Sequence, residues 1–289
     1  MRKANKEKID GINKIKMPSS FPFNWFFFPF KNDWKFYEHT PEASTSETKI
    51  ISNMWSDLKP IELHKIKVVP FPEKDYFKEE FTKKQIVLHH TVSGNGVTGD
   101  IATWEDDNSV VGTAIIIDRD GTPYQLFSSK YWAWHLGIGN KARDSQSIGI
   151  EIDNWGYLIP GDGTIKQFGK KADGTPKMIQ TEVGKYYTYY GNAVDVPMQY
   201  YPDGFRGYNY YEKYTLEQIR TAGELILFWK DKYGIPVKYN EDMWDVSQKA
   251  LSGEPGVWTH VSYRPANAKT DLHPQPEVIE MLKTLSSIS

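Results

Sequence analysis

The most constraining feature of this 289-residue sequence is a short segment, Ser147–Ile152, that is apolar at almost every position. A strand that is buried on both faces has this composition, so we expect the segment to lie in the centre of a sheet. Further apolar segments at 85–89, 113–117 and 124–127 predict neighbouring strands. Asp118–Gly121 supplies the residues of a hairpin turn between the last two.

Two helices are expected after these strands. Thr215 and Gln218 form a capping box, apolar residues follow at helical spacing, and Gly234 and Pro236 end the helix. A second helix begins at Pro276 and buries an apolar face. Strands mixed with helices at this spacing predict an α/β fold, with a mixed central β-sheet flanked by helices.

The chain divides into an extension and one domain. Residues 1–80 form an N-terminal extension of unknown role, in which only 50–58 predicts a short amphipathic helix. Residues 21–34, which include the Phe-rich segment 21–30, are expected to cover an exposed face of the following domain by ordinary packing. The alternative is a patch that binds the cell wall or a partner. Residues 81–289 form a single domain, interrupted at about 157–214 by an insertion that is rich in Gly, Lys and Tyr.

Composition excludes several classes of protein. The 35 Lys and Arg residues nearly balance the 37 Asp and Glu residues, so the chain lacks the basic excess of a general nucleic-acid binder. No segment reaches the roughly 20 apolar residues of a membrane span. The basic N-terminus and the Phe-rich segment do not form a signal peptide, because Pro22 and Pro29 interrupt the apolar residues and no small-residue cleavage site follows. We therefore expect a protein that is made in the cytoplasm without an export signal.

The chain contains no cysteine, which excludes disulfide scaffolds, thiolate metal sites and cysteine nucleophiles. Any metal site must therefore use His, Asp or Glu. His39 and His64 lie in the extension, without other ligands close in sequence, and are expected at the surface. His89 and His90 end a strand before a glycine-rich loop, and adjacent strand residues point to opposite faces. Only one of this pair can face a given site, and a purely structural role remains the alternative.

The segment 258–274 places His260, Lys269, Asp271 and His273 in a non-periodic loop. Such a loop can bring His260 and Asp271 together. Two imidazoles and one carboxylate form a common catalytic zinc set, which leaves a fourth position for water. A surface loop with chance polar residues is the alternative that the spacing leaves open.

Five motifs occur together in one order along the chain: Ile86–Thr91, Ala114–Leu126, Trp132–Gly137, Ser147–Ile152 and His260–Asp271. As a set they resemble the zinc-dependent N-acetylmuramoyl-L-alanine amidases of the amidase-2 type, a family of phage lysins, bacterial recycling and cell-wall amidases, and peptidoglycan recognition proteins. The resemblance covers about residues 84–285 and implies hydrolysis of the amide between N-acetylmuramic acid and L-alanine.

The resemblance implies one zinc ion with three ligands. The first histidine of the strand-end motif corresponds to His89, which leaves His90 a structural role. His260 and Asp271 correspond to the other two ligands. Some members have a cysteine at the last position, so this chain matches the aspartate users. His273 is not expected to be a ligand.

The resemblance also implies the catalytic and substrate-binding residues. Glu151 corresponds to the general base, and a lone carboxylate in an apolar strand is costly unless it faces a polar cleft. A salt-bridged glutamate at a strand edge is the alternative. Lys269 corresponds to the residue that stabilises the oxyanion. Family members without the glutamate have a tyrosine where this chain has Thr113. His135 and Trp134 correspond to residues that line the substrate groove.

The implied partner is peptidoglycan or a muropeptide, and the implied protein is a lytic enzyme that reaches the cell wall after release. Two alternatives remain: a cytosolic recycling amidase that acts on soluble muropeptides, and a peptidoglycan-binding protein without activity. Such binders typically lack a zinc ligand, whereas this chain retains all three. Ten of the 18 tyrosines lie between Tyr186 and Tyr214, and we hypothesise that the insertion extends the groove to meet sugar rings.

Overall fold

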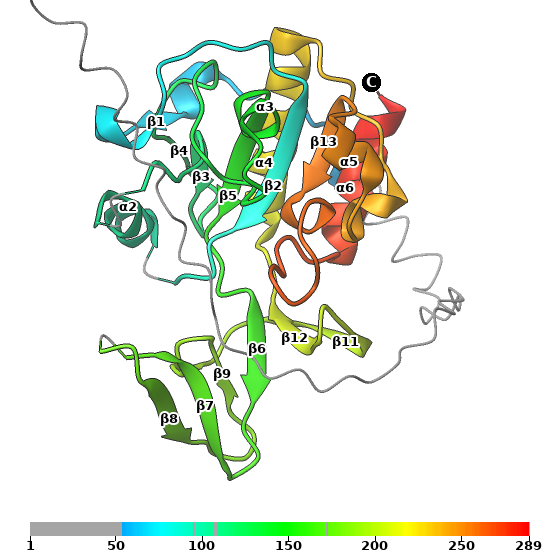
Figure 1. The fold of residues 1–289 in the computed structure, drawn as a ribbon. Coiled ribbons are helices and arrows are strands. Elements are labelled where there is room, and N and C mark those ends of the chain that lie inside the picture. Colours follow the sequence, from blue (N-terminus) through cyan, green and yellow to red (C-terminus); the bar gives the residue numbers. More distant parts are fainter. Residues whose placement is uncertain (1–53, 95, 107–108, 172, 289) are drawn as a thin grey trace, which may run out of the picture. The chain divides into compact units, whose positions relative to one another are not determined.

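A six-stranded mixed sheet forms the centre of the structure, a computed structural model that describes residues 54–288 apart from 95, 107–108 and 172 (Figure 1). Neighbouring strands are parallel, except for the antiparallel β3–β4 hairpin. The predicted α/β fold with a mixed central sheet is confirmed. In spatial order the strands are β1 (Lys67–Val68), β4 (Pro123–Gln125), β3 (Ile115–Ile117), β5 (Ser147–Ile152), β2 (Gln85–His90) and β13 (Gly256–Thr259).

Strands β2 and β5 lie in the interior of this sheet because their side chains are apolar on both faces. Every residue of β2 is buried, and in β5 only Glu151 is partly exposed. The titratable residues of both strands occur at or near the carboxyl ends, where His89 lies directly opposite Glu151 in the strand register. In an open sheet of parallel strands, this edge is where ligands bind.

The turn between β3 and β4 has the predicted residues. Gly121 donates its N–H to the carbonyl of Asp118 at 2.9 Å. Its φ of 82° lies in the left-handed region, which glycine adopts without a steric penalty. Both strands are shorter than predicted.

The two predicted helices are confirmed as α4 (Leu216–Tyr233) and α6 (Pro276–Ser287), which pack against each other. Thr215 and Gln218 exchange the side-chain hydrogen bonds of a capping box, and Gly234 ends α4 with a φ of 67°. The remaining helices of the described residues are α2 (Gly96–Asp106), α3 (Lys141–Ser145), α5 (Gln248–Ser252) and the short 3-10 helices Leu63–Lys65, Glu73–Asp75, Glu241–Trp244 and His260–Ser262.

The described residues of the extension pack into the main core. Trp55, Leu58, Ile61 and Phe71 are buried in the same hydrophobic cluster as the central strands. Burial of one such side chain contributes roughly 1.5–3 kcal/mol, so this segment stabilises the domain that it precedes. His64 is exposed beside Glu62, as predicted.

Part of the sequence interpretation lies outside the described residues. The helix expected at 50–58 enters the description only at Met54, after which the chain forms a turn. The Phe-rich segment 21–30 and His39 are not described. Within the described ranges, no helix is both long and apolar enough to cross a membrane.

The predicted Tyr-rich insertion is confirmed as an antiparallel sheet of its own. Tyrosine rings stack across its strands, and the ring centroids of Tyr157 and Tyr208 are 3.6 Å apart. A separate hairpin pairs β7 (Ile165–Lys170) with β8 (Pro176–Gln180). In spatial order the sheet contains β10 (Ala193–Val194), β9 (Tyr186–Tyr187), β6 (Tyr157–Pro160), β12 (Tyr208–Glu212) and β11 (Met198–Phe205).

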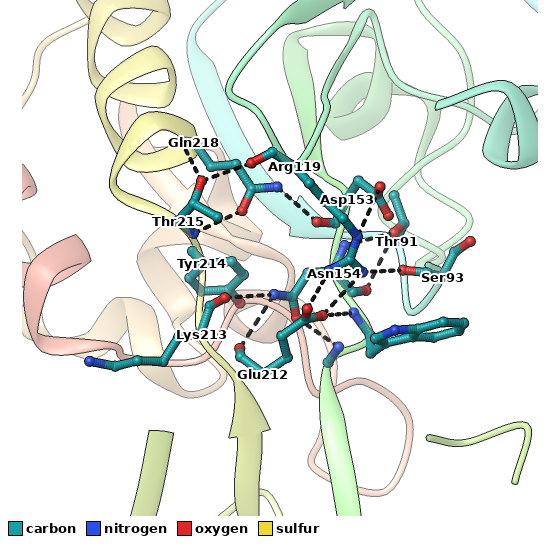
Figure 2. Close-up of polar contacts among 12 residues, drawn as sticks. Thr91, Ser93, Arg119, Asp153, Asn154, Glu212, Lys213, Tyr214, Thr215 and Gln218 are labelled. Carbon is teal, nitrogen blue, oxygen red and sulfur yellow. Dashed lines mark hydrogen bonds and ion pairs between the residues drawn. The ribbon is translucent and has the colours of Figure 1, made fainter. Parts of the chain in front are cut away.

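A polar network joins the two connections between this insertion and the central domain (Figure 2). Arg119 forms an ion pair with Glu212, with Nη2 3.2 Å from Oε2, and its Nε lies 3.4 Å from Oδ2 of Asp153. Asn154 donates its side-chain amide to the carbonyl of Glu212 at 3.3 Å, and Thr215 donates its hydroxyl to the carbonyl of Arg119 at 3.0 Å. Charge-assisted bonds of this kind fix the base of the insertion.

Candidate active site

Three neighbouring parallel strands end at one edge of the central sheet and bring polar side chains together there. β2 supplies His89 and β5 supplies Glu151. The chain that leaves β13 enters the 3-10 helix His260–Ser262, which begins with the second histidine. The following loop returns Asp271 to the same place, because the N–H of Val261 donates to the Asp271 carbonyl at 2.8 Å.

His89, His260 and Asp271 form a compact cluster in which each residue is at most 3% exposed. The two Nδ1 atoms are 2.9 Å apart, and Oδ2 of Asp271 lies 2.9 Å from Nδ1 of His260 and 3.4 Å from Nδ1 of His89. One ligand atom of each residue therefore faces a common point. Two imidazoles and a carboxylate in this arrangement fit a single zinc ion.

The protonation of this cluster also suits a metal. Burial and the charge of His260 lower the pKa of His89 to about 3, against the raising effect of Asp271. Burial alone would raise the pKa of Asp271, but the charges of His260 and Lys269 and the hydrogen bonds from both imidazoles hold it well below its ordinary value. A neutral imidazole and an ionised carboxylate are the forms that bind a divalent metal.

Hydrogen bonds at Nε2 orient the imidazoles of His89 and His260. Nε2 of His89 lies 3.0 Å from Nδ1 of His135, whose own Nε2 lies 2.7 Å from the hydroxyl of Ser147. Nε2 of His260 lies 3.1 Å from the carbonyl of Leu136. A ligand role for Nδ1 requires the proton on Nε2, so His89 donates to His135 and His260 donates to Leu136. His135, which the resemblance places in the substrate groove, thus contacts a candidate metal ligand directly.

Asp144 holds the segment that carries these two hydrogen-bond partners. Its side chain is fully buried, and Oδ1 accepts the backbone N–H groups of His135 at 2.8 Å and Leu136 at 2.9 Å. Burial raises the pKa of Asp144, against the lowering effect of these two N–H groups. The ends of β2 and β13 and this segment therefore form one continuous hydrogen-bonded unit around the cluster.

The cluster lines a cavity of about 230 Å³. Glu151, Lys269, Thr113 and His135 line the same cavity, which brings together all but one of the sequence-predicted site residues. The exception is Trp134, which packs edge-to-face on a neighbouring tryptophan and is not among the described residues that line the cavity.

Glu151 has the environment of a proton carrier. Burial raises its pKa well above the ordinary value, and the charge of Asp271 adds to this effect while Lys269 opposes it. Its Oε2 atom has no hydrogen-bond partner among the described residues. A carboxyl group with a raised pKa and an unengaged oxygen in a cavity can accept a proton and return it.

The other two histidines of the domain, His90 and His273, form their hydrogen bonds with residues outside the cluster of His89, His260 and Asp271. Nδ1 of His90 lies 2.7 Å from the hydroxyl of Tyr214. Nδ1 of His273 lies 2.8 Å from the hydroxyl of Tyr201, and its Nε2 lies 3.0 Å from the carbonyl of Glu212. His273 thus connects the insertion to the loop of Asp271.

Sequence reasoning missed part of the cavity wall. The glycines after β2 predicted a loop, but the chain from Gly96 forms helix α2, which contributes Asp100, Thr103 and Trp104 to the cavity. The insertion contributes Tyr190. The tyrosine-rich composition of the insertion was the signal that pointed to the second of these walls, whereas no signal pointed to α2.

Comparison with known proteins identifies the family. The family model of Amidase_2, described as N-acetylmuramoyl-L-alanine amidase, matches residues 81–275. Similar solved structures include the Staphylococcus aureus hydrolase AmiA in complex with its ligand (12% identity, 86% of this chain and 94% of that chain, TM-score 0.44) and the endolysin LysCS from Clostridium intestinale (16%, 69% and 82%, 0.35). AmpD is also similar (16%, 79% and 98%, 0.39). No curated protein matches the chain significantly. Because the family match spans most of the sequence, the chain belongs to the Amidase_2 family of N-acetylmuramoyl-L-alanine amidases.

Proposed function

We propose that this protein is a zinc-dependent enzyme that hydrolyses the amide between N-acetylmuramic acid and L-alanine, and that it acts lytically on the cell wall after release from the cytoplasm. One observation carries the proposal. In a chain of the Amidase_2 family, His89, His260 and Asp271 meet in the same cavity as Glu151 and Lys269.

The residues of the cavity divide the reaction between them. A bound zinc ion supplies Lewis acidity, which polarises the amide carbonyl and favours deprotonation of water. Glu151 accepts the proton of the attacking water and passes it to the leaving nitrogen, for which its raised pKa is suited. The ammonium group of Lys269 stabilises the negative charge that develops on the carbonyl oxygen. A carbon–oxygen bond forms, the carbon–nitrogen bond breaks, and the products are the muramic carboxylate and the amine of L-alanine.

The test combines metal analysis with the identity of the products. We expect one zinc per chain, release of stem peptides from sacculi as measured by mass spectrometry, loss of release after chelation, and recovery with added zinc. His89→Ala should abolish both zinc retention and release, whereas His64→Ala, at an exposed histidine, should change neither. Release that continues after the metal is removed would contradict the proposal.

Substrate size tests the lytic role. A lytic enzyme should release peptides from intact sacculi at least as efficiently as from soluble muropeptides. The reverse preference would indicate a recycling amidase. Binding of sacculi by the zinc-loaded protein without any release would indicate a recognition protein instead.

A further inference from the structure

The insertion presents one aromatic ring to the cavity that contains the candidate metal site. Tyr190 lies between β9 and β10, is 47% exposed, and lines the same cavity as Glu151 and Lys269. Tyr200 of the same insertion is 52% exposed but is not among the described residues that line this cavity. An exposed ring at a functional cavity offers a flat apolar face to a ligand.

The turn that carries Tyr190 is braced from behind by the β7–β8 hairpin. Gly169 of β7 donates its N–H to the carbonyl of Tyr189 at 3.0 Å, and Lys177 of β8 donates its ammonium to the carbonyl of Tyr190 at 2.7 Å. Gly191 follows with a φ of 75°, and a Cβ atom there would lie 2.2 Å from a side-chain carbon of Ile179. The backbone that carries the ring is therefore held in place, which lowers the entropic cost of presenting the ring to a ligand.

Helix α2 contributes a hydrogen-bond acceptor to the same cavity. Asp100 of α2 is only 5% exposed, and its Oδ2 atom has no hydrogen-bond partner among the described residues. An unsatisfied buried carboxylate oxygen is costly, so its position at the cavity suits a ligand that donates a hydrogen bond. Burial, Tyr189 and the charge of Asp100 raise the pKa of Tyr190, so the ring stays neutral and lies within electrostatic reach of the carboxylate.

A flat ring, a carboxylate acceptor and the hydroxyl of Thr103 are complementary to a sugar ring. The C–H face of a pyranose packs on an aromatic ring, and its hydroxyl groups donate to a carboxylate. A stem peptide is less suited to this wall, because its own carboxylates would be repelled by Asp100. The chemistry therefore favours the glycan over the peptide.

We infer that the insertion builds a saccharide subsite of the catalytic cavity, in which Tyr190 packs on a sugar ring of the glycan strand and Asp100 accepts its hydroxyl groups. The inference rests on the proposed function, since the sugar would belong to the strand whose peptide is released. It gives the β7–β8 hairpin a role, which is to hold Tyr190 in place.

Binding to a catalytically silent full chain tests the inference. In a Glu151→Gln background, we would measure affinity for peptide-free glycan oligomers and for free stem peptide by calorimetry. Tyr190→Ala should weaken glycan binding about tenfold and leave peptide binding unchanged, because only the ring face is lost. Tyr190→Phe should keep the affinity within about twofold, and the matched control Tyr200→Ala should not change it.

Three results would overturn the inference: no measurable glycan binding by the silent chain, equal glycan affinity of Tyr190→Ala and its parent, or a loss confined to the peptide. Asp100→Asn gives a second measurement, with an expected loss of a few-fold for glycan alone. Peptide release by the wild-type chain is measured separately. If the wild-type chain cleaves sacculi but Tyr190→Ala leaves glycan affinity unchanged, the proposed function stands and the saccharide subsite is contradicted.

Discussion

The central sheet and the insertion are built by different means. The central strands β2 and β5 have apolar residues in their middle positions and are buried on both faces apart from Glu151. The insertion is a tyrosine sheet with many exposed apolar side chains, and it is joined to the central domain through polar contacts. Its exposed large apolar residues are Ile165, Met178, Val183, Tyr189, Tyr190, Met198 and Tyr200. The sheet edge thus carries the candidate metal site, whereas the insertion offers surface to a ligand.

Besides the polar network at its base, the insertion also contacts the segment that follows His260. Arg206, in the turn between β11 and β12, has a side chain that is only 3% exposed. It donates to the carbonyl of Arg264 at 2.7 Å and to that of Val261 at 2.9 Å, and it pairs with Asp245 at 2.8 Å. Because Val261 follows His260 directly, this contact couples the insertion to a candidate ligand. The comparison therefore predicts separable effects on chemistry, on anchoring and on stability.

The largest effect is expected at the sheet edge. Glu151→Gln should lower kcat by about 10²–10⁴-fold, because the amide cannot accept a proton from water. Zinc content and thermal stability should stay at the wild-type level, and both should be measured beside the rate. Full activity of this variant would remove Glu151 from the mechanism.

The next effect concerns anchoring by the insertion. Arg206→Ala should lower the free energy of unfolding by roughly 3 kcal/mol, because it leaves two backbone carbonyls without their charged donor. It should also weaken zinc binding, which a competition titration would measure. The matched control is Lys185→Ala, which breaks an exposed ion pair of the insertion that solvent screens, and which should leave the free energy of unfolding nearly unchanged. An equal change in the free energy of unfolding for the two variants would contradict the role of Arg206 in holding the insertion to the segment after His260.

A third effect lies behind the metal site. His135→Ala removes the group that accepts the Nε2 proton of His89, and loss of such a partner typically lowers metal affinity about 10–100-fold. Zinc affinity measured without substrate separates this role from a direct contact with the substrate. Unchanged affinity together with a raised KM would indicate the substrate contact that the resemblance implies.

The smallest effect is a pH dependence at the base of the insertion. Burial raises the pKa of Asp153 to about 7 from an ordinary value of 3.8, although Arg119 opposes this shift. Between these values the folded chain retains a proton that the unfolded chain has lost, so the contribution to stability falls as pH rises. We expect Asp153→Asn to reduce the loss of stability between about pH 5 and about pH 8 by roughly 1–2 kcal/mol. The free energy of unfolding of variant and wild type would be measured at several pH values across this range. The same pH dependence for both would contradict the raised pKa of Asp153.

Local patterns in the sequence were sufficient for the central elements. The apolar composition of Ser147–Ile152 predicted an interior strand, and Thr215 with Gln218 predicted the start of α4. The three candidate ligands could be named because strand ends and family motifs place them in the sequence. In each case the informative residues are close neighbours along the chain, and their physical role depends on the local backbone.

Tertiary structure alone decided which distant residues meet. No local pattern indicated that His135 would contact His89 or that Arg206 would contact the segment after His260. The composition of the insertion suggested that it extends the groove, but it did not single out Tyr190 among the ten tyrosines between 186 and 214. Such contacts join residues far apart in sequence, and single polar or aromatic side chains leave no periodic signal. The sequence determined the elements and the candidate ligands of the site, whereas packing determined the walls around them and the residues that hold them in place.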